Sequence, residues 1–220
     1  MLIGLIGCKG SGKDTVADII QKHMAANRTA FANKIKKVCA KHFNLQENLF
    51  HDQSLKEVAL GKVEILGIVR CLEIMEDFGL GTDLTNDQRN YLGTIALLEM
   101  TSPRVIMQIV GTQILRYMDN EVHIRTIELD KLEGTTIVTD VRMPNELKHL
   151  RGYKGEFLPL YIQRDVSEDK VNENSHESEK NVLLIRNDCV KIENNGTLEE
   201  LEEKVLDVLR IKKELKAGVL

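Results

Sequence analysis

The sequence lacks the features that define several classes of protein. Its four cysteines are scattered over 220 residues without a C-x-x-C pair, and its six histidines show no ligand spacing. We therefore expect free thiols in a reducing compartment, with no disulfide framework and no cysteine metal cage. No apolar stretch is long enough to cross a bilayer, and the short one at residues 2–6 has no secretory-signal pattern. A cytoplasmic protein without membrane partners is expected.

An excess of positive charge is also missing. The chain carries 30 Lys and Arg against 34 Asp and Glu, which gives a formal net charge of -4. Proteins that bind nucleic-acid polymers usually present a strongly basic surface. We therefore expect no nucleic-acid polymer as a partner, and a small anionic ligand must be met by a local cluster of positive groups.

What the sequence does have is a glycine-rich turn, in LIGLIGCKGSGKDT at residues 2–15. Gly7-x4-Gly12-Lys13 has the spacing of a phosphate-binding loop, and it lies between an apolar strand at 2–6 and an amphipathic helix at 13–25. Glycines let backbone N–H groups approach phosphate oxygens, and the helix start adds positive potential. A simple tight turn is the alternative. The residues predicted to hold a nucleotide here are Gly7, Lys9, Gly10, Ser11, Gly12, Lys13, Asp14 and Thr15.

Asp14 departs from the usual motif, in which a Ser or Thr follows the lysine and holds magnesium. Thr15 cannot take over this role, because one helical step turns a side chain by about 100° away from the phosphates. A carboxylate is a good hard-oxygen ligand for magnesium, directly or through water. We therefore predict that Asp14 faces the metal and that nucleotide binding depends steeply on magnesium.

Strand patterns return later in the chain and alternate with helices. This alternation predicts an α/β fold with a central parallel sheet flanked by helices. Residues 34–133 are mostly helical in pattern, and we expect them to form an insertion beside the sheet within a single domain, 1–220. The polar stretch at 165–181 fits a mobile loop or a solvated linker equally well. The later strands are predicted at 29–32, 135–140, 157–164 and 189–194, with a final helix from Thr197.

Polar residues at two predicted strand ends are candidates for the same site. Asp140 ends the apolar run TTIVT, at the edge of an open α/β sheet where ligands bind, and it suits magnesium or its water shell. Arg142 follows two positions later and can grip a phosphate bidentately. Alternatively, Asp140 caps a helix that begins near Pro144. Arg164 ends the next strand and can offset the charge of a transferring phosphoryl group, or it is an ordinary surface arginine.

The segment 102–118 predicts a helix that begins at Pro103 and buries one apolar face. Its opposite stripe suits a phosphate and a base edge, although an ordinary exposed face fits the periodicity as well. The stripe contains Arg104, Gln108, Thr112 and Arg116, with Gly111 beside it.

Five segments together resemble the deoxynucleoside monophosphate kinases of tailed bacteriophages, within the P-loop nucleoside monophosphate kinase superfamily. They are GCKGSGKDTVADII at 7–20, SPRVIMQIVGTQILR at 102–116, IVTDVRMPNE at 137–146, NSHESE at 174–179 and IENNGTLEEL at 192–201. They follow the family's order over nearly the whole chain, and residues 45–100 match least. The resemblance implies a P-loop kinase fold with a helical acceptor-binding region at 34–133 and a mobile lid at 165–187.

The resemblance also implies the reaction. With ATP and Mg2+ as cofactors, the γ-phosphoryl group would pass to a deoxynucleoside 5′-monophosphate, so the partners would be small-molecule nucleotides. The family shares Lys-Asp-Thr after the loop glycine, which makes Asp14 a family feature. If a phage encodes the chain, the compartment would be the host cytoplasm.

Individual roles follow from the matching positions. Lys13, Asp140, Arg142 and Arg164 would be catalytic, with Asp14 and Asp140 as the metal ligands. The acceptor would be held by Lys34, Arg104, Gln108, Gly111, Thr112, Arg142, His176 and Glu177, although the family often has Pro in place of Lys34. Asn194, Asn195 and Gly196 fall where related kinases wrap the adenine, in addition to the ATP-binding loop.

Other functions stay open at this point. Phosphomevalonate kinase of the animal type shares a Gly-Lys-Asp loop and a strand ending in Asp-x-Arg, but the Ser-Pro-Arg…Gln…Gly-Thr helix favours a nucleotide acceptor. A nucleotide-binding switch would bind ATP without consuming it faster in the presence of a dNMP. A structural phage protein with a degenerate loop would bind no nucleotide. The acidic C-terminal helix is expected to pack on the sheet, with a homodimer contact as the alternative.

Overall fold

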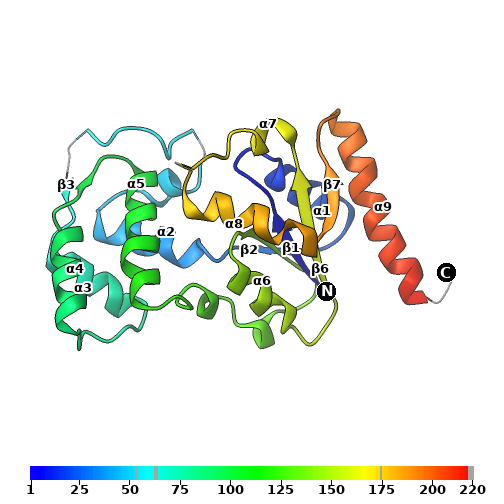
Figure 1. Cartoon of the computed structure of the whole chain (residues 1–220). Coiled ribbons are helices and arrows are strands. Elements are labelled where there is room, and N and C mark those ends of the chain that lie inside the picture. Colours follow the sequence, from blue (N-terminus) through cyan, green and yellow to red (C-terminus); the bar gives the residue numbers. More distant parts are fainter. Residues whose placement is uncertain (53, 62–63, 174, 218–220) are drawn as a thin grey trace. The chain divides into compact units, whose positions relative to one another are not determined.

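Two units make up the chain in the computed structural model, which describes residues 1–52, 54–61, 64–173 and 175–217. The first, here called the sheet unit, comprises Met1–Phe31 and Ile127–Leu220, and the second, the helical unit, is Ala32–Thr126. Both can be followed by colour in Figure 1, where the helical unit runs from light blue to green. Each unit has its own hydrophobic core and is described by itself.

Five parallel strands form the centre of the sheet unit, in the order β2-β5-β1-β6-β7 (Figure 1). The first strand is central because Leu2 pairs with Thr136 on one side and with Phe157 on the other. This order places the carboxyl ends of β1, β5 and β6 side by side at one edge of the sheet, which is where ligands bind in open α/β sheets. The strands are β1 (Leu2–Ile6), β2 (Asn27–Thr29), β5 (Thr136–Val141), β6 (Phe157–Gln163) and β7 (Val190–Glu193).

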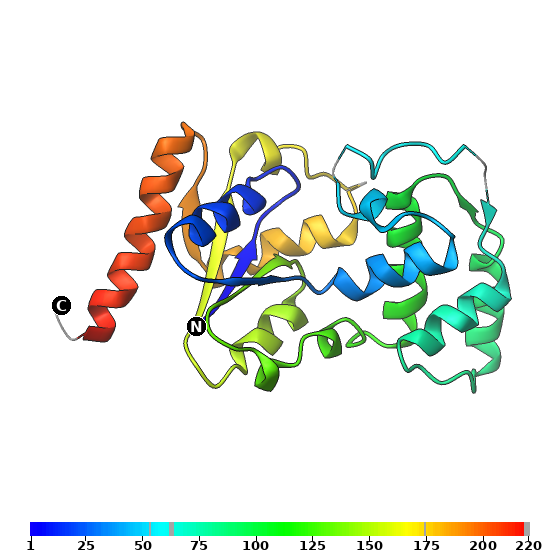
Figure 2. The same ribbon diagram turned by 180° about the vertical axis from the view of Figure 1, so that it is seen from behind.

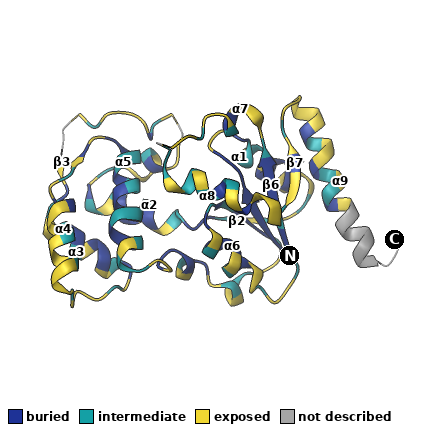
Figure 3. Cartoon of the chain, viewed as in Figure 1, coloured by how far each residue is buried: buried dark blue, intermediate teal, exposed yellow. Residues whose placement is uncertain are grey.

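Helices cover both faces of this sheet. Ile3 and Leu5 of β1 point into a core shared with α1 (Lys13–His23) and α9 (Leu198–Ala217). Leu2 and Ile6 point into the opposite core, shared with α6 (Pro144–Arg151) and α8 (Glu177–Ile185). Figure 2 shows the unit from the α1 side, and Figure 3 shows the buried strands between the two helical layers. Burial on both faces explains why β1 is a continuous apolar run.

The helical unit contains four α-helices and a short antiparallel pair of strands among its described residues. Its core is one cluster that includes Phe50, Ile74, Leu92 and Ile114, all fully buried. The strands β3 (Glu64–Ile65) and β4 (Glu99–Met100) are too short to show a strand pattern in the sequence. The helices are α2 (Asn33–His42), α3 (Ile68–Asp77), α4 (Asn86–Ile95) and α5 (Pro103–Gln108), with 3-10 turns at Glu47–Phe50 and Ile124–Thr126.

The predicted regular helix over 102–118 needs a correction. An α-helix runs only from Pro103 to Gln108, and a π-helical stretch, Ile109–Arg116, continues it. A π-helix has more residues per turn than an α-helix, so four-residue spacing no longer keeps side chains on one straight stripe. Arg104, Gln108, Thr112 and Arg116 are all half-buried, whereas Gly111 is buried.

The polar stretch at 165–181 also differs from the expected loop. A short helix, α7 (Asp165–Glu168), opens it, and α8 begins at Glu177. The second half of the predicted lid is therefore a helix, because Val182 and Ile185 supply an apolar face that packs on the sheet core. Residue 174 lies outside the described residues. No helix in the described part of the chain has the length and hydropathy to cross a membrane.

Candidate functional site

The turn between β1 and α1 has a backbone that requires glycine. Gly10 and Gly12 have φ values of +81° and +99°, a region that side-chain-bearing residues rarely adopt. A Cβ atom on Gly12 would collide with the side-chain amide of Asn194. That amide donates a hydrogen bond from Nδ2 to the Ser11 carbonyl at 2.8 Å, which ties the turn to the end of β7. The positive φ values and the contact with Asn194 thus restrict the shape of the turn.

Lys13 places its ammonium group over this turn. Nζ donates to the carbonyl oxygens of Gly7 and Cys8, at 2.7 and 2.9 Å. Burial, followed by the nearby positive charge of Arg142, lowers the pKa of Lys13 to about 8. A negative ligand at the turn would reverse this effect and stabilise the charged lysine, so the position suits an anion.

Ser11 adds a second group that a ligand would satisfy. Its hydroxyl is buried, and it has no hydrogen-bond partner among the described residues. A buried hydroxyl without a partner costs free energy, and such groups in native structures usually mark a ligand, a water molecule or strain.

Arginines from the neighbouring strand ends also lie at this edge. Arg164 follows β6 directly and donates from Nη1 to the Gly10 carbonyl at 3.4 Å. Arg142 follows β5, and its backbone is fixed by Glu146, whose buried carboxylate accepts from the N–H groups of Arg142 and Met143 at 2.8 and 3.1 Å. Glu146 was not among the predicted site residues. The sequence offered one signal for it: a glutamate in the first turn of a helix, here two residues after the opening proline, often bonds the backbone N–H groups that precede the helix.

Glu179 is a further residue that the sequence reasoning missed. Its Oε1 accepts from Arg142 Nη1 at 2.5 Å, and its Oε2 accepts from the backbone N–H of Lys9 at 2.6 Å. The carboxylate therefore joins α8 to the glycine-rich turn. The segment NSHESE contains Glu179, but its polar composition gives no reason to prefer it to the neighbouring Glu177.

The two predicted metal ligands have different neighbours. The side chain of Asp14 is 76% exposed, and its Oδ1 lies 3.7 Å from Nη2 of Arg28. Oδ1 of Asp140 accepts from the backbone N–H of Phe31 at 2.8 Å. The alternative cap role for Asp140 is not seen, since Met143 precedes α6 and Glu146 bonds its amide. No group of three or more His, Cys, Asp and Glu side chains suited to a metal occurs within the described residues.

The remaining predicted residues of the sheet unit make local contacts. His176 caps α8, where Nδ1 accepts from the Ser178 N–H at 3.2 Å, and Glu177 is exposed. Asn195 exchanges two hydrogen bonds with Asp165, at 2.9 and 3.1 Å. Asn195 therefore links the end of β7 to the start of α7, close in sequence to Arg164.

In the helical unit, the predicted acceptor residues lie on α2, α5 and the π-helical stretch. Lys34 places Nζ 4.7 Å from the centre of the Phe78 ring. Arg104 pairs with Glu57 through Nε and Oε1. A Cβ on Gly111 would lie 2.8 Å from Cδ1 of Ile35, so the end of the Ile35 side chain would have to shift to admit a larger residue there.

His123 supports the π-helical stretch and was not predicted. Its Nε2 donates to the Gly111 carbonyl at 3.0 Å, and its ring packs edge-on against Phe78 with centroids 5.9 Å apart. Its Nδ1 is buried without a hydrogen-bond partner among the described residues. Burial lowers the pKa of His123 to about 4, so the ring is neutral at physiological pH.

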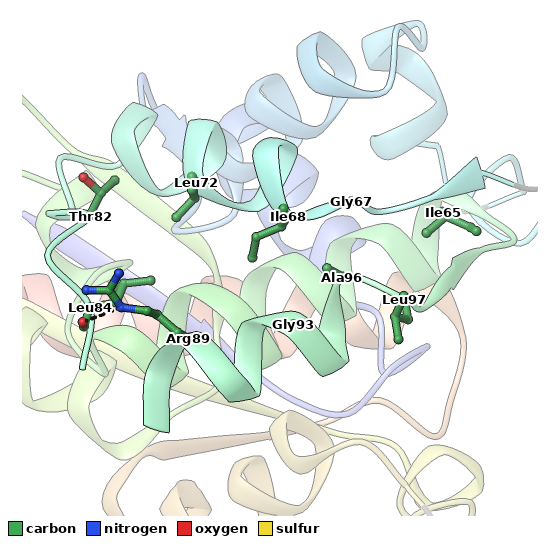
Figure 4. A pocket seen from close by; sticks show the side chains of 10 residues that line it. All are labelled: Ile65, Gly67, Ile68, Leu72, Thr82, Leu84, Arg89, Gly93, Ala96 and Leu97. Atoms are coloured by element: carbon green, nitrogen blue, oxygen red, sulfur yellow. Dashed lines mark hydrogen bonds between the residues drawn. The ribbon is translucent and has the colours of Figure 1, made fainter. Parts of the chain in front are cut away.

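A pocket of about 630 Å³ also lies in the helical unit, between α3 and α4 (Figure 4). Its walls are mostly apolar, from Ile68, Leu72, Leu84, Ala96 and Leu97, with Arg89 at one side. None of the predicted site residues lines it.

These observations define an α/β protein with a parallel sheet, flanking helices and a glycine-rich turn after its first strand. The sequence model of the deoxynucleotide monophosphate kinase family matches residues 1–70 and 69–205. The chain belongs to this family, which confirms the resemblance at the level of the family and identifies a kinase.

Individual proteins were also compared with the chain. A protein of Acanthamoeba polyphaga mimivirus, provisionally named a deoxynucleotide monophosphate kinase, is 25% identical over 222 residues, which is 94% of each chain. A crystal structure of an unliganded sugar kinase from Janibacter sp. HTCC2649 covers 96% of this chain and 94% of its own at 15% identity. Its TM-score is 0.38, so this likeness carries no argument. The predicted bacteriophage origin stays a prediction.

Proposed function

We propose that the protein transfers the γ-phosphoryl group of ATP to a deoxynucleoside 5′-monophosphate in a magnesium-dependent reaction. Family membership supports a nucleotide kinase. The observation that carries the proposal further is the glycine-rich turn, where Lys13, Arg142 and Arg164 surround backbone donors at the ends of three adjacent strands. Backbone N–H groups and several cations at a helix start are the groups that bind polyphosphates.

Positioning and charge neutralisation are the tasks that fall to the protein. The acceptor phosphate oxygen is already anionic at neutral pH, so no strong general base is needed. Lys13 would hold the terminal phosphates, and the guanidinium groups of Arg142 and Arg164 would offset the charge that develops during transfer. The orphaned Ser11 hydroxyl would gain a hydrogen-bond partner when phosphates occupy the turn.

The magnesium ion would be held by Asp14 and Asp140. Both are hard oxygen donors, the type that magnesium prefers, and waters and phosphate oxygens commonly complete its shell. When bound, the ion supplies positive charge to the phosphates. The carboxylate of Asp14 is 76% exposed, so such an ion can reach it, although the ion must compete with the positive charge of Arg28.

The acceptor nucleotide would be held by residues of the helical unit, in particular Arg104, Gln108, Gly111 and Thr112. The π-helical stretch supports this assignment. Such stretches are rare in proteins, and where they occur they often lie at functional sites. Arginine suits a phosphate, and amide and hydroxyl groups suit a base edge.

The test is coupled ADP release with ATP, magnesium and each of the four dNMPs in turn. We expect turnover that requires a dNMP and falls by at least about 100-fold in Lys13→Ala, because the terminal phosphates lose their charge partner. Phosphomevalonate serves as a fifth acceptor in the same assay. Measurable ATP binding without dNMP-dependent ADP release would reject the proposal and favour a switch, or a phosphomevalonate kinase if that acceptor is used.

A further inference from the structure

A side chain from α8 reaches into the glycine-rich turn. The Glu179 carboxylate bridges the backbone N–H of Lys9 and the guanidinium group of Arg142, at 2.6 and 2.5 Å. The side chain is only 16% exposed, so the pair is shielded from much of the solvent. Solvent screens the attraction between such charges less than it does on the surface.

This carboxylate occupies the position of an anionic ligand. A backbone N–H in a glycine-rich turn and an arginine guanidinium are typical donors to phosphate oxygens. A carboxylate oxygen satisfies the same donors with the same charge sign. The single backbone N–H of Lys9 cannot be satisfied by Glu179 and by a phosphate at once. The two anions would also repel each other beside Arg142, so they compete.

The helix that carries Glu179 is anchored at its other end. Val182 and Ile185 are buried in the sheet core, whereas Glu179 lies in the first turn of α8, next to Ser178 and the capping His176. Arg142 also lies 3.5 Å from the Ser178 hydroxyl through Nη1. A change of the Glu179 rotamer, or fraying of one helical turn, would release the carboxylate without moving the buried residues.

We propose that Glu179 is an internal gate of the phosphate-binding turn. In the free protein its carboxylate occupies an anion position between Lys9 and Arg142, and the incoming polyphosphate displaces it. Arg142 then becomes available to the ligand only when the ligand arrives. The proposal rests on the proposed function for the identity of that ligand, a nucleoside triphosphate, and needs no acceptor.

A gate of this kind lowers the apparent affinity for the ligand. The measured dissociation constant is the intrinsic one divided by the fraction of protein with an open gate. Removing the negative charge of Glu179 should therefore tighten binding, which is the opposite of what loss of a binding residue does.

The experiment is calorimetric titration of wild type and Glu179→Gln with magnesium ATP, and separately with inorganic tripolyphosphate. We expect the dissociation constants of the variant to be lower by about 3- to 10-fold. Glu203→Gln, which removes an exposed glutamate of α9, controls for the change in net charge. Glu179→Ala is the second variant, and thermal melting shows whether each protein is folded.

Hydrogen exchange of the free proteins gives a second readout. The amides in the first turn of α8 should exchange faster in Glu179→Gln than in wild type, because glutamine keeps one acceptor oxygen and no charge, which weakens the tie to Lys9 and Arg142. Faster exchange limited to that turn supports the gate, and exchange equal to that of wild type contradicts it.

The outcomes separate the gate from the proposed function. Unchanged or weaker binding by Glu179→Gln and Glu179→Ala would overturn the gate and make Glu179 a positioning residue for Arg142. Tighter binding in a protein that does not phosphorylate any dNMP would support the gate and reject the proposed function. If neither ATP nor tripolyphosphate binds wild type or variants, both are overturned.

Discussion

The sheet unit and the helical unit hold their candidate residues in different ways. In the sheet unit, the polar groups lie in turns at the ends of adjacent strands, and backbone geometry fixes them, as with Gly12 and Asn194. In the helical unit, the candidates lie along α5 and a π-helical stretch, and side-chain packing fixes them, as with Gly111, Ile35 and His123. One unit depends on backbone shape, and the other depends on a packed interior.

The two units also differ in the charge of their titratable groups. The sheet unit keeps Lys13 and Arg142 close to each other and offsets them with the Gly7 carbonyl and the Glu179 carboxylate. The helical unit buries His123 as a neutral ring. Groups that remain charged suit polyphosphates, whereas a neutral buried ring suits the support of a helix. Changes made in one unit at a time should therefore separate ligand chemistry from structural support.

The largest effect is expected from Gly12→Ala, which tests backbone shape in the sheet unit. The new Cβ would collide with Asn194 at a φ of +99°, so the turn must change shape. We expect kcat/KM for ATP to fall at least about 100-fold and the free energy of unfolding to fall by about 1 to 3 kcal/mol. Steady-state kinetics and urea unfolding measure the two quantities.

Gly134→Ala is the matched control for Gly12→Ala. Gly134 also has a positive φ, +62°, but a Cβ added there would meet no atom within 4 Å, and the residue lies in the turn before β5. We expect a similar backbone strain with activity kept. A Gly12→Ala protein with more than a tenth of the wild-type activity would show that the shape of the turn is not what holds the ligand.

The second prediction concerns packing in the helical unit, through the pH dependence of His123. Between pH 4 and 6.5 the unfolded chain binds more protons than the folded one, because the folded pKa is lowered to about 4. The free energy of unfolding therefore falls as the pH drops through this window. The contribution of His123 between pH 7 and 4.5 is about 2 to 3 kcal/mol.

His123→Gln should remove this acid sensitivity, since a glutamine amide can still donate to the Gly111 carbonyl but does not titrate. Urea unfolding at pH 7 and 4.5 measures the change for each protein. His51→Gln, at an exposed histidine of the same unit, is the control and should keep the wild-type pH dependence. If the free energy of unfolding fell by the same amount between pH 7 and 4.5 in His123→Gln and in wild type, the prediction would be wrong.

Much of the sheet unit follows from local sequence patterns. The predicted strand at 2–6 is β1 itself, and the patterns at 135–140, 157–164 and 189–194 give β5, β6 and β7 within about two residues. The edge strand β2 was placed two residues late, because Asn27–Thr29 is short and mostly exposed and is defined by its pairing with β5. Apolar runs and glycines act over a few residues, so a single sequence suffices for them.

The contacts that complete the candidate site could not be predicted in this way. Glu179 meets Lys9 across 170 residues, and Glu146 was one of two acidic residues near a predicted helix start, with Asp140. His123 bonds the Gly111 carbonyl within a π-helical stretch, and the apolar spacing of 102–118 fits a regular helix equally well. Contacts between distant segments depend on the packed structure, which a local pattern does not contain.

The smallest effect is expected from Asp14→Ser, which tests a single negative charge of the sheet unit. Asp14 repels the phosphates unless a cation lies between them, so the variant should bind metal-free ATP better and magnesium ATP no better. We expect the ratio of ATP affinities with and without magnesium to fall by about 3- to 10-fold. Titrations with magnesium and with EDTA measure this ratio.

Asp18→Asn is the matched control for the role of Asp14. Asp18 lies one turn further along α1, is 68% exposed and pairs with the same Arg28 at 2.8 Å, so its loss perturbs that arginine without touching the turn. The ratio should stay at the wild-type value in Asp18→Asn. If Asp14→Ser also left it unchanged, Asp14 would be a partner of Arg28 alone, and magnesium would have to be held without it.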